Sequence, residues 1–298
     1  MTIKRPPAIV INDSTLRDVE RMRPLTFFQQ NKIDIAQGLE KVGVGEIELA
    51  MPSSRGTEID DLSAIAAVLS RAKPILWGPA SRHTVDAAAR SGLGSVTLSV
   101  KLSARYAGRT AVLDRLTRII IHARERGLTV GLCGDDASRA DFDLIRAVIA
   151  AAEAAGASRF RFTDTMGVLH PIRTHALFRQ LCAETDLELE FRGHDDFGLA
   201  TANTLAAVEG GATHVSVSLV RRAEHSHAAQ LEDVVGAIRI STMHPVNVDL
   251  TRIPPLASLV AVALGRPLPS RHRHPGRSPV PQGAVTMDFG VTQGMEGR

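Results

Sequence analysis

Several residue types are scarce in this chain of 298 residues, and each scarcity excludes a class of protein. Its two cysteines, Cys133 and Cys182, are too few and too far apart for a disulfide framework or a zinc knuckle, which favours a reducing compartment. Aromatic residues make up 4% of the sequence, with one Trp and one Tyr, so the core must consist mostly of Ala, Leu, Val and Ile. That composition is typical of helices packed over a parallel sheet.

Long apolar runs and an excess of one charge are also lacking. No segment approaches ~18 consecutive apolar residues, and the N-terminus has no apolar signal segment, so we expect a cytoplasmic protein without a membrane partner. Lys and Arg number 35 against 32 Asp and Glu, which gives a net charge of +3. The arginines are scattered beside acidic residues instead of clustering with aromatics, so we expect no nucleic-acid partner.

What the sequence does contain is a regular alternation of short β-branched runs and longer helical patterns. Apolar residues spaced i, i+3, i+4 predict a helix between successive runs, and several of these patterns end in Gly, which suits a left-handed helix cap. The predicted strands cover 8–12, 46–51, 74–78, 95–100, 129–133, 159–164, 187–192 and 213–220. Eight such units in roughly 235 residues favour a closed (β/α)8 TIM barrel over a doubly wound sheet.

In this prediction the barrel spans 1–250, and 251–298 form a short C-terminal extension that is partly irregular because it is rich in Pro, Gly, Arg and His. An apolar stretch at 256–264 predicts a short helix and favours a homodimer. In a barrel, functional side chains lie at the C-terminal ends of the strands. Polar residues stand at those places: Asp13, Arg17, Asp18, Glu48, Asp135, Asp136, Thr165, His194 and Asp195.

Three segments carry a family resemblance: NDSTLRDVE (12–20), TDTMGVLHP (163–171) and GHDDFGLATANTLAAVEGGATHVSVS (193–218). Through them the chain resembles the family of homocitrate synthase and 2-isopropylmalate synthase. The resemblance implies a barrel in which an acyl-CoA methyl group is deprotonated and attacks the carbonyl of a 2-oxo acid held by a divalent metal. It therefore implies an acyltransferase with a small carboxylate substrate, acyl-CoA as co-substrate and a divalent metal as cofactor.

The resemblance also implies a role for individual residues. Arg17 would hold the 2-oxo group, and Asp18 and His194 would be metal ligands. The candidate catalytic residues are Arg17, Glu20, Arg192 and His194, and the candidate substrate-binding residues are Glu48, Thr165, Asp195 and Arg221.

Two of the four metal ligands that the resemblance implies are missing. The family's HxH pair appears as Arg192-Gly193-His194, and the family's GERxGN aligns with AEHSHA, which puts Ala228 in the place of a ligand Asn. Two protein ligands would hold a divalent ion weakly, and at ~4 Å the charge of Arg192 would oppose it by several kcal/mol. We therefore predict no tightly bound metal between Asp18 and His194.

Three interpretations of Arg192 follow. In the first, the guanidinium groups of Arg17 and Arg192, joined by that of Arg221 or Arg222, replace the metal and hold a carboxylate or an oxyanion. In the second, new ligands keep the metal, namely Glu224, His225 and His227. In the third, Arg192 neutralises Asp18 or Asp195 through a salt bridge and the site is inactive. A working enzyme is favoured, which forms or breaks a carbon–carbon bond in a small carboxylate, either as an acyltransferase or as a metal-independent derivative of one. The alternative is a non-catalytic or regulatory protein that holds a small carboxylate in a basic pocket.

Other polar residues near the predicted strand ends are weaker candidates. Asp135 and Asp136 could form a carboxylate pair for acid–base chemistry. Asp136 is favoured instead as a structural residue that, with Ser138, caps the helix that follows. Cys133 is expected to be a small core residue, since no base stands beside it in the sequence.

Overall fold

The computed structural model describes residues 6–20, 28–52, 59–103, 109–220 and 228–265. Eight parallel strands close into a barrel in chain order. The strands are β1 (Val10–Asp13), β2 (Glu46–Ala50), β3 (Lys73–Pro79), β4 (Ser95–Lys101), β5 (Thr129–Asp135), β6 (Arg159–Asp164), β7 (Glu188–Gly193) and β8 (His214–Val217). All the predicted strands are confirmed, with small shifts at their ends, and so is the predicted (β/α)8 fold.

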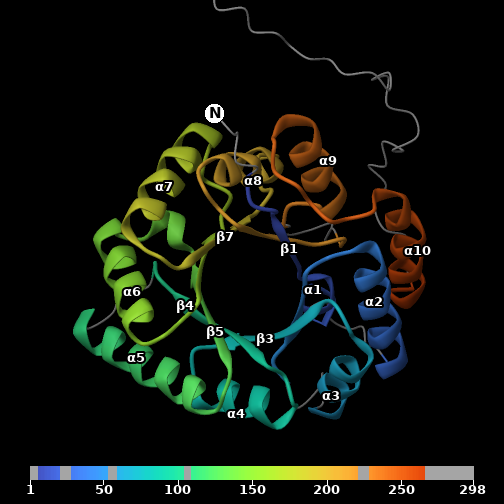
Figure 1. The fold of residues 1–298 in the computed structure, drawn as a ribbon, viewed down its shortest axis with the longest axis horizontal. Helices are drawn as coiled ribbons and strands as arrows, with labels where there is room; N and C mark the ends of the chain where they lie inside the picture. The colour runs from blue at the N-terminus through green and yellow to red at the C-terminus, as the bar shows by residue number, and fades with distance from the viewer. Residues whose placement is uncertain (1–5, 21–27, 53–58, 104–108, 221–227, 266–298) are drawn as a thin grey trace, which may run out of the picture.

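Helices form a layer around the barrel (Figure 1). They are α2 (Gln29–Val42), α3 (Ile59–Val68), α4 (Arg82–Arg90), α5 (Arg109–Glu125), α6 (Phe142–Ala154), α7 (Pro171–Glu184), α8 (Ala200–Glu209) and α9 (Leu231–Ser241), with short 3-10 turns at Ala137–Arg139 and Leu250–Arg252. One further helix, α1 (Thr15–Glu20), lies in the connection after β1. α1 was not predicted from the sequence, because six residues are too few to show a helical period.

The apolar core lies between the barrel and its helices. Outward-facing residues such as Leu132 of β5 are fully buried in it. On the side of α7, the Phe178 ring meets the edges of Phe162 and Phe191 at centroid distances of 6.2 and 5.6 Å. Because most of the core consists of Val, Ile, Leu and Ala, the predicted core composition is confirmed.

The inside of the barrel is filled differently, by charged side chains. On β6, Arg159 pairs with Glu46 of β2 at 2.6 Å, and Arg161 pairs with Glu48 at 2.7 Å. The same two arginines also contact Glu190 of β7, at 3.3 and 2.9 Å. Burying a charge is costly unless an opposite charge lies beside it, and these pairs meet that requirement. This network was not predicted from the sequence, because several of its partners, such as Arg159 and Glu46, lie far apart along the chain.

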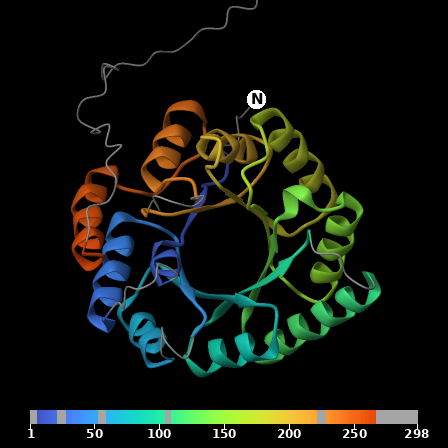
Figure 2. The same ribbon diagram turned by 180° about the vertical axis from the view of Figure 1, so that it is seen from behind.

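The predicted C-terminal helix is confirmed as α10 (Ile253–Ala263), which packs outside α2 in both views (Figures 1 and 2). Gly38 of α2 allows the close approach, because a Cβ there would lie 2.6 Å from Leu256 Cδ1. Ile253, Leu256 and Val260 are buried in the same core as the barrel. Much of the apolar surface that favoured a homodimer is therefore covered within the chain, and both the dimer and the division at residue 250 stay predictions.

Candidate functional site at the barrel mouth

The loop after β1 is folded so that two charged residues face the barrel axis at the C-terminal ends of the strands, here called the mouth. Asp13 accepts the Thr15 N–H at 2.8 Å, and Thr15 Oγ1 accepts the Leu219 N–H at 2.9 Å, which ties α1 to the end of β8. Val19, which belongs to α1, is fully buried and anchors the helix in the core. These contacts hold Arg17 and Asp18 over the mouth.

Arg192 lies on the inner face of β7 and reaches α1. Its Nη1 donates to Ser14 Oγ at 2.7 Å and to Ser216 Oγ at 2.9 Å. Its Nη2 donates to Asp18 Oδ2 at 3.1 Å and Oδ1 at 3.3 Å. The salt bridge with Asp18 that the third interpretation included is therefore present. Asp195 has a different partner, since its Oδ1 accepts the Ala200 N–H at 2.9 Å in the first turn of α8.

Arg17 approaches Asp18 from the other side. Its Nη2 lies 3.1 Å from Asp18 Oδ1, and its Nη1 lies 2.6 Å from Glu48 Oε2. The guanidinium carbon lies 4.8 Å from the centroid of the Trp77 ring, a cation–π distance. Burial alone would raise the pKa of the Asp18 carboxyl, but the charges of Arg192 and Arg17 outweigh it and hold the pKa well below its ordinary value.

These contacts pair the charges of four residues at the mouth. Two guanidiniums, of Arg17 and Arg192, face two carboxylates, of Asp18 and Glu48. The alternative of a basic binding pocket stays a prediction.

His194 directly follows β7 and lies beside Ala228, with which it forms a β-bridge. The Ala229 N–H donates to the Gly193 carbonyl at 3.2 Å and fixes this arrangement. Burial, followed by the nearby charge of Arg192, lowers the pKa of His194 to about 4, so the ring is neutral at neutral pH. Its Nδ1 is buried and has no hydrogen-bond partner among the described residues.

The residues around Asp18 do not fit a divalent metal. Both Asp18 oxygens accept hydrogen bonds from guanidinium groups, Arg192 stands at one ligand position, and Ala228 offers only a methyl group at another. Within the described ranges, no group of three or more His, Cys, Asp or Glu side chains is placed to hold an ion. The replacement ligands of the second interpretation, Glu224, His225 and His227, lie outside the described residues, as does Arg221.

Two other candidates have partners of their own. Glu20 pairs with Lys32 of α2 at 2.9 Å, so its carboxylate is turned toward the helical layer. Thr165, just after β6, accepts the Asp136 N–H at 2.9 Å through its hydroxyl oxygen, and its O–H remains able to donate to a substrate. The substrate-binding and catalytic roles of both residues stay predictions.

A second polar group, which the sequence analysis identified only in part, lies on the β4–β5–β6 side of the barrel. Asp135 accepts from Cys133 Sγ at 3.4 Å and from the Ser99 hydroxyl. Burial raises the pKa of the Cys133 thiol to about 12, which agrees with the expectation of an unreactive core cysteine. Asp136 pairs instead with Arg139, so the two neighbouring carboxylates have separate partners.

The predicted cap at Asp136 is wrong. Asp136 has φ 57° and its side chain makes no capping hydrogen bond, and Ser138 donates to Asp164 at 2.5 Å. The cap of α6 is Asp141, which accepts the Asp143 N–H at 2.9 Å. The 3-10 turn between Asp136 and α6 moved the start of the helix along the chain.

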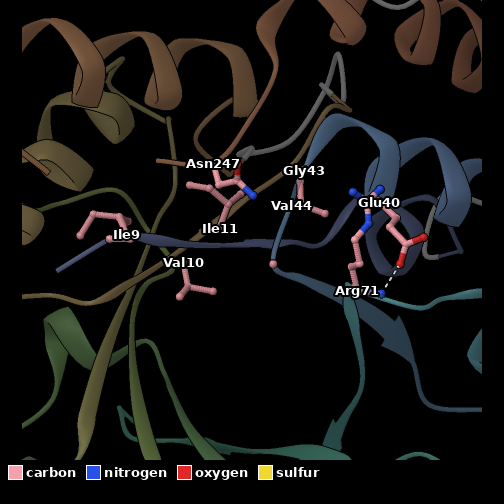
Figure 3. Close-up of a pocket in the computed structure, with 10 residues that line it drawn as sticks. Ile9, Val10, Ile11, Glu40, Gly43, Val44, Arg71 and Asn247 are labelled. Atoms are coloured by element: carbon pink, nitrogen blue, oxygen red, sulfur yellow. Dashed lines mark hydrogen bonds between the residues drawn. The ribbon is translucent and has the colours of Figure 1, made fainter. Parts of the chain in front are cut away.

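A cavity of about 220 Å³ lies at the opposite, N-terminal end of the barrel (Figure 3). Its lining includes apolar residues such as Ile9 and Val44, together with Glu40 and Arg71. The Glu40 carboxylate accepts the backbone N–H groups of 70–72 at 2.6 to 3.0 Å. Since this face of a TIM barrel generally serves stability, and the candidate residues lie at the other end, we assign the cavity no function.

The architecture defines the class: a (β/α)8 barrel with charged and polar groups at the C-terminal strand ends. A family model described as HMGL-like matches residues 8–260. The chain belongs to the HMGL-like family, which confirms the family that the sequence resemblance indicated. None of the helices in the described ranges is both long and apolar enough to cross a bilayer.

Three proteins with sequences similar to this chain are named as synthases. The chain is 34% identical over 275 residues to 2-isopropylmalate synthase 2 of Caldanaerobacter subterraneus, covering 90% of this chain and 72% of the relative. It is 35% identical over 267 residues to homocitrate synthase 1 of Nostoc, covering 88% and 71%. It is 36% identical over 274 residues to homocitrate synthase of Frankia alni, covering 90% and 78%.

Solved structures confirm the fold. The HMG-CoA lyase of Bacillus subtilis superposes with a TM-score of 0.75 at 19% identity, covering 90% of this chain and 97% of that one. An HMG-CoA lyase of Acinetobacter baumannii in complex with coenzyme A and 3-methylmalate gives a TM-score of 0.76 at 18% identity, covering 92% and 98%.

Proposed function

We propose that this chain is an acyltransferase of the homocitrate and 2-isopropylmalate synthase type, with an altered metal site, that joins the acyl group of an acyl-CoA to a small 2-oxo acid. The names of its relatives support the reaction class. One observation carries the proposal: Arg17, at the mouth, is fixed by Glu48 and lies over Trp77, so a cation is held where a substrate would enter.

The reaction needs a base and a positive group. A base removes a proton from the carbon beside the thioester, and that carbon forms a bond to the carbonyl carbon of the 2-oxo acid. The carbonyl oxygen becomes an alkoxide that takes up a proton, and water then cleaves the thioester to release CoA and a carboxylate. Arg17 and Arg192 would stabilise the alkoxide, which gains negative charge in the transition state.

Asp135 is the candidate base in this proposal. It lies at the end of β5 and accepts from Ser99 and Cys133, whereas Glu20 is tied to Lys32. Thr165 would donate to the substrate carboxylate through its O–H, while its hydroxyl oxygen accepts the Asp136 N–H. Neutral His194 would offer a hydrogen bond without adding charge.

The test is release of free CoA thiol from acetyl-CoA with a panel of 2-oxo acids. We expect turnover with at least one acid, and Arg17→Gln should lower kcat/KM by ~100-fold or more, as removal of an oxyanion donor does. Arg146→Gln, on the outer face of α6, is the matched control and should leave the rate unchanged. No release with any acid, together with thermal stabilisation by a di- or tricarboxylate, would instead support the binding-protein alternative.

A further inference from the structure

We propose that the Arg192 guanidinium is the resident cation of the mouth: it occupies the place between Asp18 and His194 where a divalent metal would bind, and it excludes such an ion. The chemical class of ligand that this site then takes is an oxyanion or carboxylate, recognised by paired guanidiniums. The part of the inference that concerns substrate rests on the proposed function, whereas the part that concerns metal does not.

Arg192 is fixed on three sides. Its Nη1 binds the hydroxyls of Ser14 and Ser216, and its Nη2 binds both Asp18 oxygens. Its side chain is 6% exposed. Because the partners come from the end of β1, from β8 and from α1, the guanidinium cannot swing away without breaking contacts on all three elements.

Asp18 has little capacity left for a metal. Its Oδ1 accepts from Arg17 Nη2 and Nε at 3.1 and 3.3 Å, and from Arg192 at 3.3 Å. Its Oδ2 accepts from Arg192 at 3.1 Å and from the Ser14 hydroxyl at 2.8 Å. A carboxylate oxygen has about two lone-pair sites. A metal ion would therefore have to displace donors that already fill both oxygens.

Charge opposes the ion as well. Arg17 and Arg192 already match Asp18 and Glu48 one for one. A divalent cation would add two positive charges next to two guanidiniums, and the carboxylates of Asp18 and Glu48 already pair with arginines, Glu48 with Arg161 as well.

His194 and Ala228 stand at two of the four positions where the family resemblance implies metal ligands. The buried Nδ1 of His194 is without a hydrogen-bond partner in the described part of the chain, and the bridge to Ala228 puts a methyl-bearing residue directly beside it. Two substitutions would therefore add the missing donors, Arg192→His an imidazole and Ala228→Asn a carbonyl oxygen, and would also free Asp18 from one of its two arginines.

The experiment is a titration with Co²⁺, whose visible absorption reports coordination, followed by calorimetry. The wild-type protein should show no stoichiometric binding, and the Arg192→His/Ala228→Asn double variant should bind one ion at least ~100-fold more tightly. Adding Asp18→Asn should abolish the gained binding. Arg173→His, on the exposed side of α7, is the control for adding a histidine and should bind as the wild type does.

Several results would overturn the inference. One is stoichiometric binding by the wild type that is lost on His194→Gln. Another is wild-type binding lost on His225→Ala/His227→Ala, because the ligands would then come from the loop after β8. A folded double variant that still binds no ion would also contradict it. If circular dichroism shows that the double variant is unfolded, the inference is tested by Co²⁺ titration of the wild type, of His194→Gln and of His225→Ala/His227→Ala.

Turnover separates this inference from the proposed function. CoA release that persists in excess EDTA supports both. Release that EDTA abolishes and Mn²⁺ restores overturns the role of Arg192 and leaves the acyl-transfer proposal intact. No release under any condition, with the Co²⁺ results as expected, overturns the proposed function and leaves the exclusion of metal by Arg192 intact.

Discussion

The lower interior of the barrel and its mouth both bury arginines, but in inverse arrangements. Below the mouth, one guanidinium, that of Arg161, lies between two carboxylates, Glu48 and Glu190. At the mouth, one carboxylate, that of Asp18, lies between two guanidiniums, Arg17 and Arg192.

The two arrangements join into one alternating column. Its members, in order from the mouth, are Arg192, Asp18, Arg17, Glu48, Arg161, Glu190, Arg159 and Glu46. The column is neutral as a whole, yet it ends in a guanidinium at the mouth and in a carboxylate at the base. Paired charges of the same kind can therefore stabilise the barrel in its lower part and place a guanidinium near a ligand at the mouth.

Removing an arginine from the lower part of the column should have the largest effect on the free energy of unfolding. Arg161→Met leaves Glu48 and Glu190 buried without their shared counter-charge, and we expect a loss of about 3–5 kcal/mol in the free energy of unfolding. Denaturation by urea, followed by circular dichroism, measures it. Arg146→Met is the matched control, because the half-exposed Arg146–Glu184 pair should contribute less than about 1 kcal/mol. A loss at position 161 as small as the control's would mean that the column does not stabilise the barrel.

The contribution of His194, at the mouth, to the free energy of unfolding should depend on pH. The pKa of His194 falls from 6.5 in the unfolded chain to about 4 in the fold, so its contribution to stability is fully present above pH 6.5 and is lost as the pH falls toward 4. The wild type should therefore lose up to about 3 kcal/mol more than His194→Gln across this range.

The measurement is the difference between the two unfolding curves at each pH, because Asp13 titrates in an overlapping range with the opposite sign. Burial raises the pKa of Asp13 to about 7, so its contribution is lost as the pH rises through that value. His175→Gln, at an exposed position on α7, is the control and should follow the wild type. Parallel curves for wild type and His194→Gln would contradict the lowered pKa.

An intermediate effect is expected at the N-terminal face, where backbone geometry replaces charge. Gly43 has φ +101°, and a Cβ there would lie 2.3 Å from the Asn247 carbonyl oxygen. Gly43→Ala should therefore cost about 1–3 kcal/mol of stability. Gly236→Ala should have the opposite effect. Gly236 lies inside α9, and a Cβ there would have no neighbouring atom within 4 Å. This substitution should therefore stabilise the protein by about 0.5–1 kcal/mol. Equal effects at the two glycines would rule out the strain argument.

The smallest effect concerns the cap that the sequence analysis misplaced. Asp141→Ala removes the acceptor for the Asp143 N–H and should cost about 1 kcal/mol in thermal or urea unfolding. Asp143→Ala, exposed in the same first turn, is the control and should change stability by only a few tenths. If the control costs as much as Asp141→Ala, charge at the helix start and not the hydrogen bond would explain the effect.

The sequence by itself determined the fold. Eight β-branched runs and the helical periods between them depend on neighbouring residues, so they could be identified without tertiary contacts, and the motifs around Asp18, Thr165 and His194 indicated the family and the mouth. Even there, α1 was too short to detect, and the cap moved from Asp136 to Asp141 because of an intervening turn.

Only the tertiary structure decided what the charges do. The partners of Arg192 are Ser14, Asp18 and Ser216, the first two more than 170 residues away along the chain. Arg159 likewise meets Glu46 across 113 residues. Whether a guanidinium holds a substrate, neutralises a carboxylate or supports the barrel depends on which opposite charges the closure of the sheet brings within a few ångströms, and no local pattern of residues contains that information.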